Sequence, residues 1–306
     1  MITRVGIVAK AHLREAGPYL TEIASWLRAR NVEPAFDADT AALASDGASG
    51  GAPSAAAPPG MSGVLTVDKD RLPSLVDMIL VLGGDGTLLG MADRIVLADT
   101  NIPILGVNFG GLGFLTEVTL PELYPSLEAA LNGSAPIDER MTLRAATLRR
   151  GAIFEDRIVL NDVVVTQGAL SRIIELSVTV DDQFVTRVRA DGLIVSSPTG
   201  STAYNLAAGG PILHPRVDAL VIAPIAPHTL TQRPLVIPGS SEVRIQPHLD
   251  GSRDEVYVTF DGQFGFRLQE GDLVTVRRSE RPLRLIRATS RSYFEVLREK
   301  LKWGQR

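Results

Sequence analysis

Residues 78–97 read MILVLGGDGTLLGMADRIVL. The first five of them are apolar and stop abruptly at Gly83-Gly84, as a buried strand does where its chain turns. From Leu88 to Leu97 the apolar residues recur at intervals of three and four, which indicates a helix. A buried strand that leads through glycines into a helix is typical of a parallel sheet with helices on its faces.

The flanking segments continue this alternation of strand and helix. Val5–Ala9 is another short apolar run, Tyr19–Arg30 has apolar residues at helical spacing, and Ile102–Val107 has the character of a further buried strand. We therefore expect an α/β domain of Rossmann-like type, with a parallel sheet, over residues 1–141.

Residues 41–63 interrupt this domain, because 20 of the 23 are Ala, Gly, Ser or Pro. Such a composition cannot bury enough apolar surface to offset the entropy that ordering would cost. We expect a flexible surface loop here, which is either a tolerated insertion or a lid over a site.

From about residue 142 the chain consists of short β-branched segments separated by Gly, Asp and Pro. These segments are 143–148, 158–165, 174–180, 184–188, 241–245, 256–260 and 273–277. Many short strands with turn signals favour a β-rich sandwich domain over residues 142–288. Ser292–Trp303 returns to helical spacing, and we expect this C-terminal helix, in 289–306, to dock on the first domain.

Composition excludes several classes of protein. The 306 residues include 31 Lys and Arg against 35 Asp and Glu, and they contain no cysteine. Without cysteine there is no disulfide scaffold, thiol nucleophile or Cys-ligated zinc site. No basic stripe predicts nucleic-acid binding, and no apolar run reaches the length of a membrane span. The apolar run near the start is too short for a signal peptide, so we expect a cytoplasmic protein.

The loop Gly83–Thr87 has the features of a phosphate site. Glycines at the end of a strand let backbone amides approach a ligand, and the helix start that follows favours an anion. The loop matches neither a Walker motif nor the spaced glycines of a Rossmann fingerprint. It carries Asp85, which is a candidate general base for an attacking hydroxyl, or else the cap of a tight strand-to-helix turn.

A second polar segment, Ser196–Asn205, follows the short apolar run 193–195 and is dense in hydroxyls and glycine. Hydroxyls and backbone amides can hold sugar hydroxyls or phosphate oxygens, and the ring of Tyr204 can stack on a base. The alternative is a Ser/Thr-rich turn with Tyr204 packed in a core. Ser201 lacks the Gly-x-Ser-x-Gly elbow of a hydrolase nucleophile, so we do not assign it that role.

Three smaller features complete the set of polar candidates. Asn161-Asp162 stands before an apolar run, where it either caps a turn or binds a ligand. Asp261-Gly262-Gln263 lies between two strand patterns and reads most simply as a hairpin turn. Arg172 and Arg189 are either solvated strand-edge charges or phosphate ligands.

Taken in order, these motifs resemble those of the NAD kinases. The resemblance rests on Gly83-Gly84-Asp85-Gly86-Thr87, Asn161-Asp162, Asp191-Gly192, Ser196–Asn205 and Gly209-Gly210-Pro211. It extends over nearly the whole chain apart from residues 41–63. The glycine-aspartate loop alone is shared with lipid kinases and phosphofructokinases, whereas the Thr-Gly-Ser-Thr-Ala-Tyr segment is more specific to NAD kinases.

The resemblance implies a phosphotransferase that acts on an alcohol group, moving the terminal phosphoryl group of ATP to the 2′-hydroxyl of the adenosine ribose of NAD. Asp85 would accept the hydroxyl proton, while Gly83, Gly84, Gly86 and Thr87 would contact phosphates. The NAD-binding residues it implies are Asp85, Gly86, Phe114, Asn161, Asp162, Arg172, Arg189, Asp191, Thr202, Ala203, Tyr204, Asn205, Leu206, Ala207 and Gln263.

The resemblance also implies a divalent cation, most simply Mg²⁺, and a homodimer or homotetramer. ATP or polyphosphate would be the donor, and NAD the acceptor. The chain departs from the family's usual pattern at Asp162, where Glu is more common, and at Gly90, where many relatives carry a longer polar side chain. Two alternatives stay open: a lipid or sugar kinase with the same glycine loop, and a protein that senses NAD without converting it.

Overall fold

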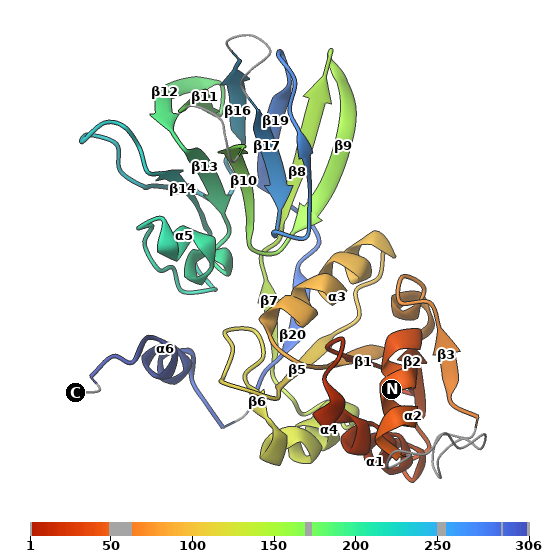
Figure 1. Cartoon of the computed structure of the whole chain (residues 1–306). Helices are drawn as coiled ribbons and strands as arrows, with labels where there is room; N and C mark the ends of the chain where they lie inside the picture. The colour runs from red at the N-terminus through yellow and green to blue at the C-terminus, as the bar shows by residue number, and fades with distance from the viewer. Residues whose placement is uncertain (1, 49–62, 169–172, 250–254, 289, 305–306) are drawn as a thin grey trace. The chain divides into compact units, whose positions relative to one another are not determined.

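The computed structural model describes residues 2–48, 63–168, 173–249, 255–288 and 290–304 (Figure 1). The chain divides into two compact units, Met1–Glu139 with Arg284–Arg306 and Arg140–Leu283. The boundaries expected from the sequence, at 141–142 and 288–289, stay predictions. Among the described residues, no helix has both the length and the apolar character that a membrane crossing requires.

The first unit is built on a parallel sheet, as the sequence predicted. In the described residues the strands lie in the order β3-β2-β1-β4-β5-β20-β7, with β6 beside β5. Their bounds are β1 Arg4–Ala9, β2 Glu33–Asp37, β3 Leu65–Val67, β4 Met78–Leu82, β5 Ile104–Asn108, β6 Val118–Thr119, β7 Ile137–Arg140 and β20 Leu283–Ile286. The pairs β1–β2, β1–β4, β4–β5 and β5–β20 are all parallel. Strands β4 and β5 are buried along their whole length, which explains their unbroken apolar runs.

Helices and short 3-10 turns accompany this sheet. They are η1 Arg14–Ala16, α1 Gly17–Arg28, α2 Ala38–Ala48, η2 Leu72–Leu75, α3 Asp85–Leu97, η3 Leu120–Glu122, α4 Leu123–Leu131 and α6 Tyr293–Leu301. Leu20, Ile23 and Leu27 of α1 are fully buried in one core with β1 and β4 residues. The predicted C-terminal helix is confirmed as α6, which starts with a capping box between Ser292 and Glu295.

The loop expected over residues 41–63 is wrong in its first part, because residues 41–48 belong to α2. Alanine has the highest helix propensity, so an alanine-rich segment can form a helix where one face finds a core. Ala44 lies on that face, since it is fully buried in the core of the first unit. Residues 49–62 lie outside the described part of the chain.

The second unit is a β sandwich, which confirms the expected β-rich fold. In the described residues one sheet has the order β15-β14-β13-β10-β17-β18 and the other β12-β11-β16-β19-β8-β9. The strands are β8 Leu143–Arg149, β9 Ala152–Val159, β10 Asp162–Gln167, β11 Ile174–Val180, β12 Gln183–Ala190, β13 Gly192–Ser196, β14 Ala219–Ile225, β15 Leu235–Pro238, β16 Val243–His248, β17 Val256–Phe260, β18 Phe264–Arg267 and β19 Leu273–Arg278. Strand β13 is followed by η4 Gly200–Thr202 and α5 Tyr204–Ala207. Buried residues of both sheets form one core.

Two local predictions in this unit have different outcomes. Residues 158–165 are not one strand, because β9 ends at Val159 in one sheet and β10 begins at Asp162 in the other. The turn at Asp261–Gln263 is confirmed as the β17–β18 hairpin, with Phe260 paired to Phe264. Asp261 and Gly262 have φ of 51° and 63°, which is the geometry that favours an Asp-Gly pair in a hairpin.

Candidate functional site

The glycine loop of the first unit lies where the strand order of its sheet reverses. Strand β1 has β2 on one side and β4 on the other, and ligands of open α/β sheets bind at such a point, beyond the carboxyl ends of the strands. Lys10, directly after β1, donates its backbone N–H to Leu82 O at 2.8 Å. Gly83 follows β4 and Gly84 caps α3, so the expected strand, loop and helix start are confirmed.

The carboxylate of Asp85 is held by the segment that follows β5. Its Oδ1 accepts the N–H groups of Leu115 at 3.1 Å and Thr116 at 3.0 Å, together with the Thr116 hydroxyl at 2.9 Å. Among the described residues, its Oδ2 accepts a hydrogen bond only from the N–H of Phe114, at 2.9 Å. Because Oδ2 is the less engaged oxygen, it is the one with capacity to take a proton.

Two glycines, Gly113 and Gly83, allow close packing around Asp85 and the glycine loop. A Cβ at Gly113 would lie 2.1 Å from Asp85 Oδ1, so only glycine allows the carboxylate to sit against the backbone here. A Cβ at Gly83 would lie 2.9 Å from the Thr87 hydroxyl oxygen, so the Thr87 side chain packs against the loop. Gly86 is exposed in the first turn of α3. The loop therefore combines accessible backbone with a rigidly placed carboxylate.

A pocket of about 400 Å³ opens over this loop. Its charged lining residues are Asp85, Lys10 and Lys300, the last from α6. The other lining residues are Leu13, Gly83, Gly84, Asn108, Phe109, Gly110, Gly111 and Gly113. Glycine backbone with two cations at its rim is suited to an anionic ligand such as a phosphate chain.

In the second unit, Asp261 holds the backbone of the predicted Asn161-Asp162 pair. Its carboxylate accepts the N–H groups of Leu160 at 2.7 Å, Asn161 at 2.7 Å and Asp162 at 3.0 Å. On the other side of the chain, a Cβ at Gly200 would lie 2.1 Å from Asn161 O. The pair is thus confined between a hairpin turn and the η4 segment.

The environment of Asp162 is unusual for a carboxyl group. The residue is only 5% exposed, and burial, followed by the nearby charge of Asp261, raises the pKa of Asp162 to about 7. A buried carboxyl that changes protonation near neutral pH can either donate or accept a hydrogen bond, which suits it to a sugar hydroxyl.

The hydroxyl-rich segment after β13 separates into supporting and accessible residues. Ser201 is fully buried and donates to Pro198 O at 2.6 Å, which is a structural role and not that of a nucleophile. Asn205 is also fully buried and donates to Ser201 O and Pro211 O, both at 3.1 Å. Tyr204 is 47% exposed, so the alternative of a core tyrosine does not hold.

The remaining predicted residues have mixed surroundings. Arg189 is exposed on β12, and Gln263 is exposed in the hairpin next to Asp261. The backbone N–H of Asp191 donates to Ile225 O, and its carbonyl accepts the N–H of Gln167. Thr202, Ala203 and Leu206 are half-buried, while Ala207 is exposed. Arg172 lies outside the described residues.

Three residues of these sites were missed or underrated from the sequence. Asp261 was read only as a turn, and Lys10 and Lys300 were not singled out. An Asp-Gly pair indicates a hairpin and says nothing of a carboxylate reaching residues about a hundred positions away. For the lysines, the one available signal was that Lys10 directly follows the first strand, beside the expected ligand edge.

The described residues contain no group of three or more His, Asp or Glu side chains placed to hold a metal. Asp85 is the carboxylate at the pocket, and backbone amides engage both of its oxygens. Mg²⁺ is commonly bound by one or two carboxylates together with substrate phosphates. Of the residues that line the pocket, Asp85 alone offers a carboxylate, so a bound cation would take its other ligands from phosphate oxygens and water.

Comparisons with known proteins identify the family. The model of the ATP-NAD kinase N-terminal domain matches residues 5–135, and that of the ATP-NAD kinase C-terminal domain matches residues 160–288. The chain is 46% identical to the NAD kinase of Geotalea daltonii over 303 residues, with 99% of each protein covered. It is 47% identical to the NAD kinase of Geobacter metallireducens over 305 residues, again with 99% of each covered.

Solved structures agree with the family models. The crystal structure of yeast NADH kinase complexed with NADH superposes with a TM-score of 0.86 at 26% identity, covering 100% of this chain and 89% of that one. An NAD kinase from Archaeoglobus fulgidus in complex with ATP has a TM-score of 0.71 at 24% identity, covering 97% of this chain and 99% of that one. The second likeness supports the fold.

Proposed function

The chain belongs to the NAD kinase family, and on that premise we propose that it transfers the terminal phosphoryl group of ATP to the 2′-hydroxyl of the adenosine ribose of NAD, forming NADP. The observation that carries the proposal is Asp85 in the lining of a pocket rich in glycine backbone and lysine. Such a site offers a proton acceptor beside a place for phosphates.

In the proposed reaction the proton of the ribose hydroxyl moves to Oδ2 of Asp85. The hydroxyl oxygen forms a bond to the γ-phosphorus, and the bond from that phosphorus to the bridging oxygen breaks, so that ADP leaves. Four hydrogen bonds hold the carboxylate, so its position does not depend on substrate. Phosphoryl transfer depends mainly on such alignment and on charge compensation.

Mg²⁺ bound to the phosphates would neutralise part of their negative charge. The chain's own contribution on this side is the backbone of Gly83, Gly84 and Gly86, with the start of the 13-residue helix α3 behind it. Thr87 would help to shape this loop, because a Cβ at Gly83 would lie 2.9 Å from its hydroxyl oxygen.

On the dinucleotide side, we assign the ribose hydroxyls to Asn161 and Asp162 and the adenine to Thr202, Ala203 and Tyr204. The exposed ring of Tyr204 and the confined, buried Asp162 support these roles. Other contacts implied by the family likeness are Phe114, Arg172, Arg189, Asp191, Asn205, Leu206, Ala207 and Gln263. Asn205 would act through its backbone or by shaping the loop, because its side-chain Nδ2 donates to two carbonyls of the loop itself.

The test is a coupled assay with purified protein, NAD, ATP and Mg²⁺, in which an NADP-specific dehydrogenase reports the product. NADP formation establishes the reaction, and replacing NAD by NADH or ATP by polyphosphate then defines the substrates. A folded protein that makes no NADP, yet binds NAD in calorimetry, would be a sensor. Absence of both NADP formation and NAD binding would contradict the proposal, and a lipid or sugar acceptor would be tried next.

Assembly and location are further parts of the proposal. Family likeness supports a homodimer or homotetramer in the cytoplasm, and the mass from light scattering tests the first of these. A monomeric mass in a fully active preparation would contradict it.

A further inference from the structure

Lys10 is placed beside the glycine loop by the sheet. Its backbone N–H is bound to the carbonyl of the last residue of β4, which brings the end of β1 against the start of the loop. A Cβ at Gly83 would lie 3.1 Å from Cβ of Lys10, so the lysine stem runs next to the loop backbone. In the described part of the chain no acidic side chain is paired with Lys10.

Lys300 reaches the same pocket from the last turn of α6. Its Nζ lies 6.0 Å from the centroid of the Phe114 ring, and the N–H of Phe114 is bound to Oδ2 of Asp85. Lys300 and Asp85 thus line the same pocket, and Phe114 contacts both of them. Within the described ranges Lys300 likewise has no acidic partner.

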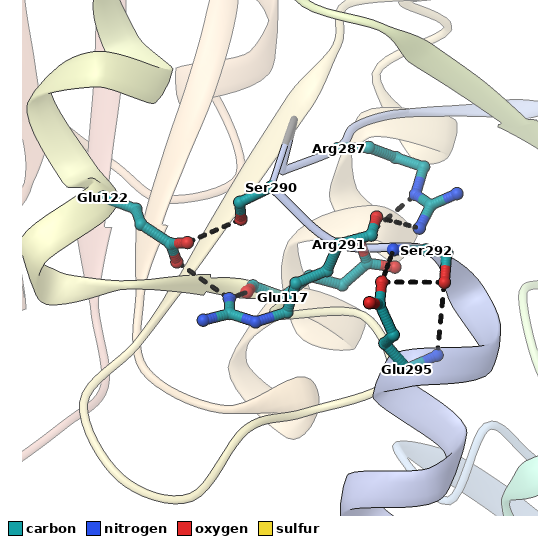
Figure 2. A network of polar contacts seen from close by, with 7 residues as sticks. All are labelled: Glu117, Glu122, Arg287, Ser290, Arg291, Ser292 and Glu295. Carbon is teal, nitrogen blue, oxygen red and sulfur yellow. Dashed lines mark hydrogen bonds and ion pairs between the residues drawn. The ribbon is translucent and has the colours of Figure 1, made fainter.

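Hydrogen bonds and ion pairs connect the chain before α6 to the segment from Glu117 to Glu122, as Figure 2 shows. Arg291 donates to Glu122 at 2.9 Å and to the backbone carbonyl of Glu117 at 3.1 Å. Arg287 donates to the Glu117 carboxylate at 3.1 Å, and Ser290 to Glu122 at 2.6 Å. This network, together with the capping box at Ser292, sets where α6 begins and so where Lys300 lies.

The hydrogen bonds of Glu122 also fix its protonation state. Burial alone would raise the pKa of its carboxyl, but hydrogen bonds from Ser290, Thr119 and Arg291 lower the pKa to about 2. The carboxylate therefore stays charged over the whole neutral and mildly acidic range. The C-terminal helix accordingly belongs to the first unit and is bonded to it through these side chains.

We propose that Lys300 and Lys10 bind the polyphosphate chain of the phosphoryl donor, so that the C-terminal helix completes the donor site. The inference rests on the proposed function for its choice of ligand. Two lysines in the lining of a glycine pocket supply the charge that a triphosphate requires, and lysine serves as a point charge where a phosphate chain lies against backbone. Lys300 is thus a binding residue, and Arg287 and Arg291 position it.

The experiment compares Lys300→Ala, Lys300→Arg and Lys10→Ala with the control Arg298→Ala. Arg298 is exposed on the same helix, does not line the pocket, and carries the same charge. Loss of a charged hydrogen bond raises KM for ATP by about tenfold or more in Lys300→Ala and Lys10→Ala. KM for NAD should stay within about twofold, and Lys300→Arg should recover most of the loss, because the charge is kept.

A second readout is calorimetric binding of inorganic tripolyphosphate to the full-length protein at low and high salt. Wild type and Arg298→Ala should bind it, and Lys300→Ala should bind about tenfold more weakly, with a smaller salt dependence. Equal KM for ATP and equal tripolyphosphate affinity in Lys300→Ala and Arg298→Ala would overturn the inference. Thermal melting ensures that every variant compared is folded.

The two proposals fail in different ways. If wild type forms no NADP, the proposed function fails, while a loss of tripolyphosphate binding in Lys300→Ala still supports a phosphate site at the helix. If wild type is active and both lysine variants keep the wild-type KM for ATP and the wild-type affinity for tripolyphosphate, the inference fails and the function stands.

Discussion

The carboxylate of Asp261 accepts the backbone N–H of Asp162 at 3.0 Å, although 99 residues separate the two. Burial and then the charge of Asp261 raise the pKa of the Asp162 carboxyl to about 7. One side chain thus sets both the backbone position of the predicted ribose-binding pair and the protonation of one of its members. This relationship leads to two predictions.

The first concerns Asp261 itself. Asp261→Ala leaves the N–H groups of Leu160, Asn161 and Asp162 without their acceptor, at a cost of about 1–3 kcal/mol for each buried group. We expect a lower melting temperature and a higher KM for NAD, with KM for ATP little changed.

Asp261→Asn separates these two effects, because an amide oxygen can keep the Asn161 and Asp162 bonds while the charge is lost. We expect a pKa of Asp162 below that of wild type, measured by NMR titration of the carboxyl. An unchanged pKa would mean that burial alone sets it.

The second prediction is the pH dependence of stability at Asp162. The pKa rises from 3.8 in the unfolded chain to about 7 in the folded one, so the native state prefers the protonated form. The stability associated with this preference is complete below about pH 4 and is lost as the pH rises through 7.

Asp162→Asn should therefore be more stable than wild type at pH 8, by about 2–4 kcal/mol, and similar to it at pH 4. Urea unfolding at the two pH values measures this difference. The control is Gln183→Ala, at an exposed and uncharged side chain of the same unit, which should change stability by the same amount at both pH values. If the free energy of unfolding changed with pH in the same way in wild type and in Asp162→Asn, the carboxyl would not be protonated in the native state.

A third prediction separates the base role of Asp85 from its structural role. Asp85→Asn should reduce kcat by about 10²- to 10⁴-fold, because the proton acceptor is lost. The control Thr116→Val removes one of the four hydrogen bonds to the carboxylate and keeps the base, so kcat should fall by no more than about tenfold. Equal losses in the two variants would mean that the Phe114–Thr116 segment, and not proton transfer, is what the mutation of Asp85 disturbs.

A fourth prediction follows from the exposure of Tyr204. Because the ring is 47% exposed, Tyr204→Ala should change the free energy of unfolding by only about 0.5 kcal/mol. It should weaken NAD binding by about 1–3 kcal/mol if the ring stacks on adenine. Phe184→Ala, at another exposed aromatic of the same unit, is the matched control and should leave NAD affinity unchanged. An NAD affinity equal to that of wild type would show that the ring does not stack on the adenine.

A fifth prediction tests the attachment of α6. Arg291→Ala removes the bonds to Glu122 and to the Glu117 carbonyl, so amides of α6 should exchange with solvent at least about tenfold faster. KM for ATP should rise because Lys300 is then less well placed. Arg30→Ala, which removes an exposed ion pair with Glu128 in the same unit, should alter neither.

The same attachment should depend on pH in the acid range. Glu122 has its pKa lowered from 4.5 to about 2, so its contribution is complete above about pH 4.5 and is lost as the pH falls toward 2. Exchange of the α6 amides should accelerate over that interval in wild type and not in Glu122→Gln. An exchange rate independent of pH after correction for the intrinsic rate would contradict this account.

Local patterns were sufficient for the elements around the glycine loop. Five apolar residues, two glycines and a helical repeat predict β4, the loop and α3 within a few residues, because periodicity and backbone freedom are properties of adjacent residues. The turn at Asp261 and the helix after Ser292 could be predicted for the same reason, although the cap of that helix was not. Where composition was the only guide, as in 41–48, burial of Ala44 gave a helix in place of a loop.

The residues that complete the two sites came together only through packing. Asp85 meets Phe114–Thr116 about 30 positions away, Asp261 meets Asn161 100 positions away, and Lys300 reaches the glycine loop from the far end of the chain. None of these contacts has a signature in spacing, because they arise where separate strands and helices pack side by side. The sequence alone was enough for the kind of fold and the family, through motifs that local chemistry requires. Which carboxylate oxygen is open, which carboxyl is neutral near pH 7 and which lysines face the pocket depend on neighbours that folding supplies.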